Sequence, residues 1–522
     1  LTEQFGIRSL EFSPEFGFKL NGKKIFLQGN ANHHDLGALG ATCYDKAIER
    51  MMLQLKSFGY NCIRCSHNPY SDSFARIADR VGILVVDELT DKWSDNDYWG
   101  GRQPFTHIWH KLITEWIKRD RNRPSIILWS LGNELQIREG WAGFEGTNDW
   151  GITTYNIFNQ LVKRWDHTRL TTVAMFPARA GAITRHDKEF NDYLVPPELA
   201  FVIYVASFNY QSDKYDAYLK YRPDLILFQS EAETSNLLQP YYNMDKERMV
   251  GIAYWGSVEY WGESNKWPKK GWNYSFFEHT MRPYPQAYLI KTAFMPEIPE
   301  VHIGVVDAAG AESVSWNDVI VGRMALNECW NHTPGSRRSL FTFTNAHSVE
   351  LLVNGQSMGI QKNDTTRANL RNMIYWKDVP YGNGGSVVAI ARDKSGKEVA
   401  RHRIETAGKA VALRIEAETP TDWKADGMDL QYINVTVIDK KGRPVWDYNE
   451  PLTLQMEGAA RLVALDNGDH YTDELFHGIT SKRMYQGRMQ IILRSDQEAG
   501  NVTVKISSAG LKGTLRLKTI KE

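Results

Sequence analysis

The sequence predicts an α/β fold, a (β/α)8 barrel, followed by two all-β sandwich domains. The chain has 522 residues, more than one hydrophobic core accommodates, so several domains are expected. Up to about residue 298, short apolar runs alternate with stretches of helical periodicity. From about residue 300 the runs become period-two or continuously apolar, and Asn, Asp and Gly turns separate them, which is typical of β-sandwiches.

Short apolar runs form the strand pattern of the first half. They lie at 25–29, 62–65, 83–87, 126–130, 171–175, 201–205, 225–229 and 250–255. Between them, apolar residues recur at i, i+3, i+4 and i+7, as in Ile48, Met51, Met52 and Leu55, and again in Trp109, Leu112, Ile113 and Trp116. Eight strands with interleaved helices are typical of a closed barrel. A doubly wound open sheet is the rival, but no GxGxxG motif follows the first run.

The second half contains strand-like runs at 340–343, 349–353, 387–391, 433–437 and 502–506. Turn sequences lie at 354–355, 383–385 and 439–442, and two modules fit the length, with a boundary near 406–410. Residues 2–12 read as one strand without a partner strand before it, which predicts that a preceding domain has been removed. We therefore expect a remnant of that domain and a linker at 1–16, the barrel at 17–298, and sandwiches at 299–408 and 409–522.

The composition excludes several partners. Lys+Arg and Asp+Glu are equal at 62 each, so the chain has no electrostatic footprint for nucleic acid or an anionic membrane. No window approaches 18 consecutive apolar residues, so no membrane span is expected. Cys62 and Cys65 form a CxxC inside an apolar run without a second pair, which indicates buried thiols rather than a zinc site. The many aromatic residues suit sugar faces and large cores alike.

Polar residues follow the predicted barrel strands, where function resides in such barrels. The residues after the first, second and third runs are Asn32, His33, His34 and Asp35, then Arg64, Ser66, His67 and Asn68, then Asp87 and Glu88. The later runs are followed by Asn133 and Glu134, by Asn209 and Tyr210, by Ser230 and Glu231, and by Trp255 with Glu259 and Trp261 close behind. An open binding groove would be equally polar, so this crowding alone does not establish chemistry.

Two of these residues could form a catalytic pair. Glu134 ends the fourth run and Glu231 the seventh, so both can face the barrel mouth. Glycoside hydrolysis needs two such carboxyl groups, about 5–5.5 Å apart when configuration is retained and farther apart when it is inverted. One must stay protonated and the other ionised. A salt bridge or a helix cap is the alternative for any single glutamate at a strand end.

Five motifs carry a resemblance to a known family. They lie at 29–37 (GNANHHDLG), 63–69 (IRCSHNP), 86–88 (VDE), 129–134 (WSLGNE) and 227–231 (LFQSE). With them the chain resembles the family 2 glycoside hydrolases, in the branch of β-galactosidases, β-glucuronidases and β-mannosidases. The resemblance covers essentially the whole chain: 343–355 looks like the β-domain that follows the barrel, and residues from about 410 look like an immunoglobulin-like domain.

The resemblance implies roles for the residues that match. Glu134 would be the general acid/base and Glu231 the nucleophile, with Glu233 as a conceivable alternative nucleophile. Asn133 would hydrogen-bond the sugar 2-hydroxyl. The other implied substrate-binding residues are Tyr210 beside the nucleophile, Arg64 orienting it, His33 and His67 at sugar hydroxyls, Trp255 beneath the ring, and Trp261. For His34 and Asp35, a short polar loop bonding to itself is an equal alternative.

Three departures from the family pattern affect specificity and metal binding. Glu259 stands where related galactosidases commonly have Asp. Residues 90–93 replace the metal-site residues that follow Asp-Glu in some large galactosidases, so neither a metal nor a cofactor is expected. Asn265 and Lys266 lie near the place of the Asn-x-Lys element of glucuronidases but without its spacing, which disfavours glucuronic acid.

We therefore expect a retaining exo-β-glycosidase that hydrolyses terminal non-reducing β-galactosides of oligo- or polysaccharides through a covalent intermediate. The alternatives are a β-glucuronidase, a β-mannosidase, or a non-catalytic carbohydrate-binding protein, although a decayed enzyme should have lost one carboxylate. Carbohydrate is the expected partner, and a homo-oligomer is left open. The resemblance implies a bacterial periplasmic or secreted protein, and a chain that lacks the N-terminal domains of a longer enzyme.

Overall fold

The computed structural model describes residues 5–93, 104–135, 151–176, 196–264, 267–307, 312–316 and 319–521. The chain forms two compact units. The first comprises 1–34, 52–257 and 317–319, and the second comprises 35–51, 258–316 and 320–522.

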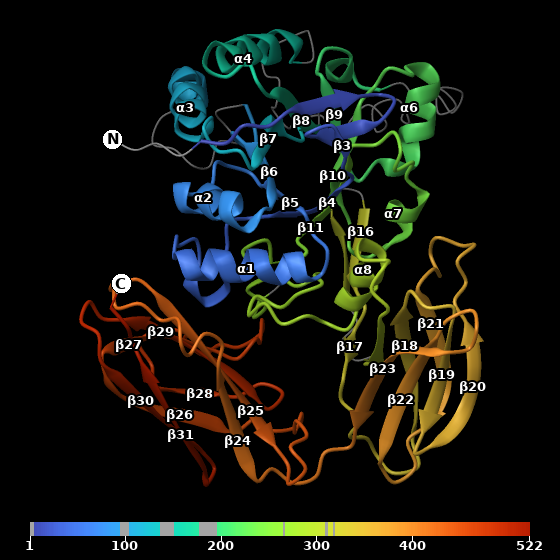
Figure 1. Ribbon diagram of the computed structural model, residues 1–522, viewed down its shortest axis with the longest axis vertical. Helices are drawn as coiled ribbons and strands as arrows, with labels where there is room; N and C mark the ends of the chain where they lie inside the picture. Colours follow the sequence, from blue (N-terminus) through green and yellow to red (C-terminus); the bar gives the residue numbers. More distant parts are fainter. Residues whose placement is uncertain are drawn as a thin grey trace. The chain divides into compact units, whose positions relative to one another are not determined.

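A closed barrel of parallel strands is the centre of the first unit (Figure 1). Around the barrel the strands follow the order β10-β11-β4-β5-β6-β7-β8-β9. They are β4 (Leu27–Asn32), β5 (Cys62–Cys65), β6 (Leu84–Glu88), β7 (Ile126–Asn133), β8 (Leu170–Met175), β9 (Val205–Asn209), β10 (Leu227–Ala232) and β11 (Gly251–Trp255). A small sheet precedes them, made of β1 (Leu10–Ser13), β2 (Gly17–Leu20) and β3 (Lys23–Lys24). The predicted (β/α)8 barrel is confirmed.

Helices separate the barrel strands along the chain. They are α1 (Asp45–Ser57), α2 (Asp72–Val81), α3 (Phe105–Asp120), α4 (Ile152–Trp165), α6 (Tyr215–Tyr221) and α7 (Gln239–Asn243). Figure 1 shows α2, α3, α4 and α6 on the outside of the strands. Helix α2 is typical: the Ser71 side chain accepts the Phe74 N–H at 3.2 Å, and Gly82, at φ 76°, ends the helix in the left-handed region. Both stretches with predicted helical periodicity lie in helices, α1 and α3.

Barrel closure depends on a glycine at the start of β11. A Cβ at Gly251 would lie 2.4 Å from the Leu27 carbonyl oxygen on the neighbouring strand β4. Real Cβ atoms do not approach a backbone oxygen that closely, so only glycine allows the two strands to pair here. The last strand of the barrel thus joins the first, and the ends of all eight strands surround one mouth.

Several barrel strands continue farther along the chain than the apolar runs that predict them. The run 201–205 is wrong as a strand, because a 3-10 turn occupies Glu198–Phe201 and β9 begins only at Val205. Strands β4, β7 and β10 extend three residues beyond the predicted runs. Each extension contains at least one polar residue: Asn32, Asn133 and Glu231 are examples. Hydrophobic periodicity cannot follow a strand into the polar mouth of a barrel.

Sheets make up most of the second unit. Four-stranded sheets have the orders β17-β14-β18-β21, β20-β19-β22-β23, β24-β25-β29-β27 and β28-β26-β30-β31, and β12-β13 and β15-β16 form two-stranded ribbons. The strands are β12 (Tyr260–Trp261), β13 (Gly271–Trp272), β14 (Val301–Val306), β15 (Glu312–Trp316), β16 (Val319–Arg323), β17 (Leu326–Asn327), β18 (Arg337–Thr344), β19 (Ser348–Val353), β20 (Gln356–Lys362), β21 (Met373–Pro380), β22 (Ser386–Arg392), β23 (Glu398–Glu405), β24 (Ala412–Ala417), β25 (Leu430–Ile438), β26 (Pro451–Gly458), β27 (Ala460–Asp466), β28 (Ser481–Arg483), β29 (Arg488–Ser495), β30 (Asn501–Ser508) and β31 (Leu511–Lys518). Helix α8 (Ala287–Phe294) lies between β13 and β14 along the chain.

Two separate hydrophobic cores lie between these sheets. Ile303, Leu340 and Val387 belong to one, and Ile433, Leu454 and Val504 belong to the other. The expectation of two all-β sandwiches after the barrel is therefore confirmed as a fold class, while the exact boundaries remain predictions. The expected strand over 2–12 is wrong for residues 5–9, because β1 begins at Leu10.

Two expectations from composition can be compared with the structure. Cys62 and Cys65 are free, buried thiols, as expected, and burial raises the pKa of Cys62 to about 12. Within the described ranges, every helix is too short or too polar to cross a bilayer.

Candidate active site

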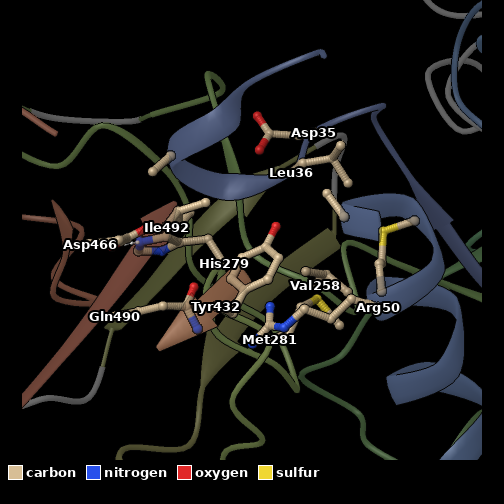
Figure 2. A pocket seen from close by; sticks show the side chains of 13 residues that line it. Asp35, Leu36, Arg50, Val258, His279, Met281, Tyr432, Asp466, Gln490 and Ile492 are labelled. Carbon is tan, nitrogen blue, oxygen red and sulfur yellow. Dashed lines mark hydrogen bonds and ion pairs between the residues drawn. The ribbon is translucent and has the colours of Figure 1, made fainter. Parts of the chain in front are cut away.

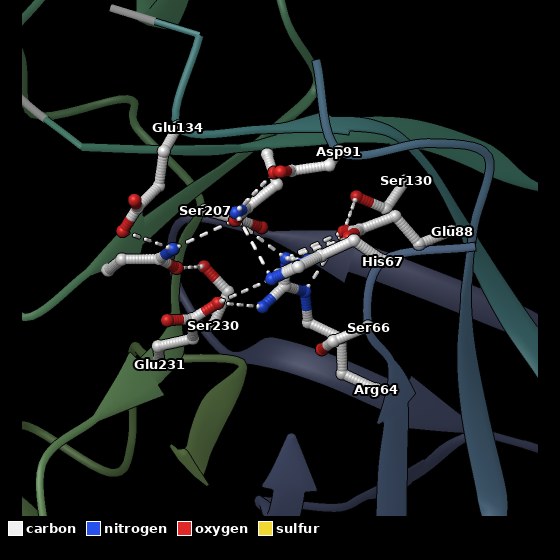
Figure 3. Close-up of polar contacts among 12 residues, drawn as sticks. Arg64, Ser66, His67, Glu88, Asp91, Ser130, Glu134, Ser207, Ser230 and Glu231 are labelled. Atoms are coloured by element: carbon white, nitrogen blue, oxygen red, sulfur yellow. Dashed lines mark hydrogen bonds and ion pairs between the residues drawn. The ribbon is translucent and has the colours of Figure 1, made fainter. Parts of the chain in front are cut away.

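A cluster of polar side chains lies at the carboxyl ends of the barrel strands (Figure 3). It contains Arg64 from β5, Glu88 at the end of β6, Asn133 at the end of β7 with Glu134 directly after it, Asn209 at the end of β9, and Glu231 in β10. All of these residues are buried. Buried polar groups are costly unless they are hydrogen-bonded, and the contacts described below supply that compensation.

Arg64 is the cationic centre of the cluster. Its Nη1 donates to Glu231 Oε1 at 2.6 Å, and its Nη2 donates to Glu88 Oε2 at 2.7 Å. Burial alone would lower the pKa of Arg64, but the two carboxylates raise it above its ordinary value. Burial would likewise raise the pKa of Glu88, whereas Arg64 and His67 hold it below the usual range. The guanidinium therefore carries its charge and orients Glu231.

A chain of amides connects this charged centre to Glu134. Asn133 Oδ1 accepts from Arg64 Nη2 and from Asn209 Nδ2, both at 2.9 Å. Asn209 Nδ2 also donates to Glu134 Oε1 at 3.1 Å. Asn133 Nδ2 donates to Asp91 Oδ1 at 3.0 Å. The two glutamates are thus positioned by one hydrogen-bonded network, and Figure 3 shows their carboxyl groups pointing toward the same space.

The two glutamates have different surroundings. Burial, reinforced by the negative charge of Glu231, raises the pKa of Glu134 to about 8. Glu231 instead accepts two hydrogen bonds from groups that favour a carboxylate, one from Arg64 and one from the Tyr210 hydroxyl at 2.6 Å to Oε2. When the surroundings keep one carboxyl group protonated and the other ionised, the first can act as the acid and the second as the nucleophile.

Glu134 and Tyr210 share an unusual backbone conformation. Their φ angles are 48° and 59°, in the left-handed region that side chains other than glycine rarely adopt. Each residue immediately follows a barrel strand, β7 or β9. Such conformations persist where the surrounding structure imposes them, and they concentrate at functional sites.

Aromatic rings lie beside the charged cluster. Trp255 stacks on His67 with centroids 5.3 Å apart and an interplanar angle of 8°, and His33 meets Trp255 edge-on at 5.2 Å. His67 Nδ1 lies 2.7 Å from Glu88 Oε1, and its Nε2 lies 3.3 Å from Asn133 Nδ2. Both contacts are satisfied when Nδ1–H donates to Glu88 and Nε2 accepts from Asn133. The structure therefore brings together Glu134, Glu231, His33, Arg64, His67, Asn133, Tyr210 and Trp255.

Other residues named from the sequence have partners outside this cluster. Trp261 belongs to the second unit, where its ring contacts His279 at 4.5 Å and His470 at 4.8 Å. His34 stacks on Tyr70, and burial lowers its pKa. Asp35 Oδ1 accepts the Gly37 N–H at 2.8 Å within its own loop, and Oδ2 accepts the Trp261 N–H at 3.1 Å, so the interpretation of a polar loop that bonds to itself holds only in part. Asn265 and Lys266 are outside the described residues.

Several residues of the network were not predicted as site residues. Glu88 lies in the motif at 86–88 and Asn209 at a polar strand end, but the sequence alone assigns neither a role. Asp91 and Lys92 belong to the segment 90–93, which departs from the metal-site residues of some large galactosidases. Lys92 Nζ donates to Asp91 Oδ1 at 2.6 Å and to the Asn133 carbonyl oxygen at 3.1 Å. Because Asp91 also accepts from the Asn133 side chain, the two residues hold Asn133 in place. Their position after a barrel strand was the only available signal.

Family models match three parts of the chain. A model described as "Glycosyl hydrolases family 2, TIM barrel domain" matches residues 15–194. One described as "Glycoside hydrolase family 2 C-terminal domain 5" matches 413–515, and a domain of unknown function matches 335–400. The two family 2 models therefore cover barrel strands β4 to β8 and most of the last sandwich.

Similar proteins span nearly the whole chain. A β-galactosidase of Bacteroides ovatus is 27% identical over 98% of this chain and 63% of its own length. A putative β-glucuronidase of Formosa agariphila is 22% identical over 98% of this chain and 63% of its own length. A crystal structure of a glycosyl hydrolase family 2 member from Bacteroides cellulosilyticus has a TM-score of 0.82 at 29% identity, covering 98% of this chain and 64% of that one. The chain thus spans less than two thirds of these relatives.

Proposed function

We propose that this chain, which belongs to glycoside hydrolase family 2, carries the catalytic centre of a retaining exo-β-glycosidase. The observation that supports this proposal is a pair of buried glutamates, one in surroundings that favour the protonated acid and the other hydrogen-bonded as a carboxylate. Glu134 has a raised pKa of about 8, whereas Arg64 and Tyr210 hydrogen-bond the carboxylate of Glu231. We assign Glu134 as general acid/base and Glu231 as nucleophile.

In the first proposed step, Glu231 attacks the anomeric carbon while Glu134 transfers its proton to the departing glycosidic oxygen. The carbon–oxygen bond to the leaving group breaks as the glycosyl–Glu231 ester forms. In the second step, Glu134, now ionised, removes a proton from water, which attacks the anomeric carbon and releases Glu231 as a carboxylate. Asn133 would bond the 2-hydroxyl by replacing its longest contact, 3.3 Å to His67.

We propose a terminal β-galactoside as the substrate. Support comes from the β-galactosidase of Bacteroides ovatus, which is 27% identical along 98% of the chain. The putative β-glucuronidase of Formosa agariphila, 22% identical along the same span, supports the alternative. The deciding experiment compares aryl β-galactosides, β-glucuronides and β-mannosides in the longest natural form of the protein that contains these residues. A glucuronide or mannoside hydrolysed with the highest kcat/KM would overturn the galactoside assignment.

The same protein tests whether configuration is retained. A 2-deoxy-2-fluoro glycoside with an activated leaving group should form a stable ester, because fluorine slows the oxocarbenium-like second step more than the activated first step. Mass spectrometry of the digest should locate the sugar on Glu231. Hydrolysis with an inverted product and no labelled peptide would contradict the proposal, and binding without turnover would favour a carbohydrate-binding protein.

The pH profile should show a basic limb controlled by Glu134. The residue donates a proton only while it is protonated, and burial beside Glu231 raises its pKa to about 8. We therefore expect kcat/KM to be maintained through neutral pH and to fall about tenfold per unit above roughly pH 8. The measurement is kcat/KM with an unactivated substrate from pH 5 to 10. A basic limb near pH 4.5, the ordinary range of glutamate, would contradict the raised pKa of Glu134.

Replacing Tyr210 by phenylalanine should slow release of the sugar from Glu231. Negative charge returns to Glu231 as the ester breaks, and the Tyr210 hydroxyl stabilises it at 2.6 Å. A hydrogen bond to a charged group is worth about 1.5–3 kcal/mol, so kcat should fall roughly 10- to 100-fold and the intermediate should accumulate. Tyr155→Phe removes another buried hydroxyl, hydrogen-bonded to Thr171 at 2.7 Å, and serves as the control. Equal losses in both variants would argue against this role.

A further inference from the structure

A second cluster of ionisable side chains lies in the second unit. Glu259 follows barrel strand β11, His279 lies in the segment before α8, and His470 lies in the loop after β27. All three are buried. His279 Nδ1 lies 3.1 Å and His470 Nε2 2.9 Å from the same oxygen, Glu259 Oε2. Three potential metal ligands from distant parts of the sequence thus converge on one point.

The contact between His470 and Glu259 is close and buried. Nε2 of His470 lies 2.9 Å from Glu259 Oε2, and within the described part of the chain Nδ1 has no hydrogen-bond partner. A nitrogen lone pair and a carboxylate oxygen repel each other at this distance unless a proton or a cation lies between them. A cation bound between the three residues would use the Nε2 lone pair of His470 and remove that repulsion.

Two of the three residues, His279 and Glu259, have neighbours of the kind found around bound metals. His279 Nε2 lies 2.9 Å from Asp466 Oδ1, a contact drawn in Figure 2. The Tyr284 hydroxyl donates to Glu259 Oε1 at 2.7 Å, which leaves Oε2 directed at the histidines. Ligating histidines almost always donate their other N–H to a carboxylate or carbonyl, and ligating carboxylates are themselves hydrogen-bonded.

The spacing and the neighbouring space also fit a small cation. Ligands of a tetrahedral zinc ion lie about 3.3 Å apart when each is about 2.0–2.1 Å from the metal. The two nitrogens lie 3.1 and 2.9 Å from Glu259 Oε2, and all three atoms lie within 4.8 Å of one another. A cavity of about 30 Å³ lined by Glu259, His470 and Tyr284 adjoins the cluster. That space is large enough to hold a water molecule, which would supply a fourth ligand.

We propose that Glu259, His279 and His470 bind a divalent transition-metal ion of the zinc class. Two imidazoles and a carboxylate are ligands that zinc accepts. The ion joins the segment after the barrel to the loop after β27. Because the Trp261 ring contacts both His279 and His470, the ion also holds this tryptophan. Sequence spacing does not reveal the site, since its ligands are 20 and 191 residues apart along the chain.

A superficially similar cluster provides the control. His302 Nε2 lies 2.8 Å from Glu328 Oε1, and the His302 and His402 rings stack with centroids 4.0 Å apart. His402 Nδ1 already accepts the Ile303 N–H at 3.0 Å. The two histidine rings of this control cluster lie face to face and do not direct their nitrogens at one oxygen. His402→Gln should therefore leave zinc binding unchanged.

The test measures zinc in the whole chain, produced without a histidine tag and stripped by a chelator. Titration against a chromophoric competitor should give about one tightly bound zinc per chain. His470→Gln should abolish it, and Asp466→Asn should weaken it about 10- to 100-fold. Zinc should also raise Tm in the wild type but not in His470→Gln.

Cobalt(II) substitution supplies a readout that does not need a folded ligand variant. The wild type should show visible d–d bands of a four-coordinate site without thiolate charge transfer, which excludes Cys43 as a ligand. No stoichiometric zinc in the wild type would overturn the proposal. Wild-type affinity in a folded His470→Gln variant would do so as well, as would loss of zinc in His402→Gln.

Discussion

Replacing Glu231 by glutamine should lower kcat by about 10⁴- to 10⁶-fold, the loss seen when one essential member of a catalytic set is removed. Glutamine keeps the size of the side chain and an oxygen that can accept from Arg64, which now donates to Oε1 at 2.6 Å. The amide cannot form the glycosyl ester, so the double displacement stops at its first step. Steady-state hydrolysis of an activated aryl glycoside measures the effect.

The neighbouring glutamate offers a matched control. Glu233 lies two residues on, burial raises its pKa, and it accepts a hydrogen bond from Asn236. Glu233→Gln removes the same charge from the same segment and should leave turnover roughly unchanged. If Glu233→Gln were inactive and Glu231→Gln active, the nucleophile would have been assigned to the wrong residue.

Replacing Glu134 by glutamine should have an effect that depends on the leaving group. For alkyl or sugar leaving groups, kcat/KM should fall about 10²- to 10⁴-fold, because an alkoxide departs slowly without a proton. For 2,4-dinitrophenyl glycosides the first step should be nearly unaffected, since that phenolate is stable without protonation. The basic limb near pH 8 should disappear with the titrating group.

The dependence of the loss of kcat/KM on the leaving group distinguishes a proton-donating role of Glu134 from a structural role. The variant keeps an oxygen that can accept from Asn209, now 3.1 Å from Glu134 Oε1. A fall of equal size for activated and unactivated substrates would mean that the site had been distorted. A surviving basic limb would mean that another group supplies the proton.

Much of the barrel could be predicted because its strands are buried between helices. Runs such as 62–65 and 126–130 are nearly all apolar, and the two helical stretches show regular spacing. The sequence predicts the ends of these strands poorly, because the last residues of each strand are the polar residues that form the site. Beyond Gly29, Ser130 and Gln229 the strands continue through polar residues, so the apolar signal stops before the hydrogen-bonded ladder does.

The position of the two glutamates and the motifs around them allow the catalytic pair to be predicted from the sequence. The electrostatic surroundings of the two carboxyl groups could not be predicted in the same way. Two glutamates at the ends of the fourth and seventh strands must approach the same mouth in any closed barrel. The raised pKa of Glu134 depends on burial and on the charge of Glu231, 97 positions away along the chain. The roles of Glu88, Asp91 and Asn209 depend on contacts that no local pattern encodes.

The sequence by itself determined the order of elements, the fold class and the residues able to do acid–base chemistry, because periodicity and residue type are local properties. Only the tertiary structure decided which polar groups share a network, since hydrogen bonds and desolvation depend on distances in space. It brought Arg64 between two carboxylates. It also directed His279 and His470 at one oxygen of Glu259, a residue that had stood out only as a departure from a motif.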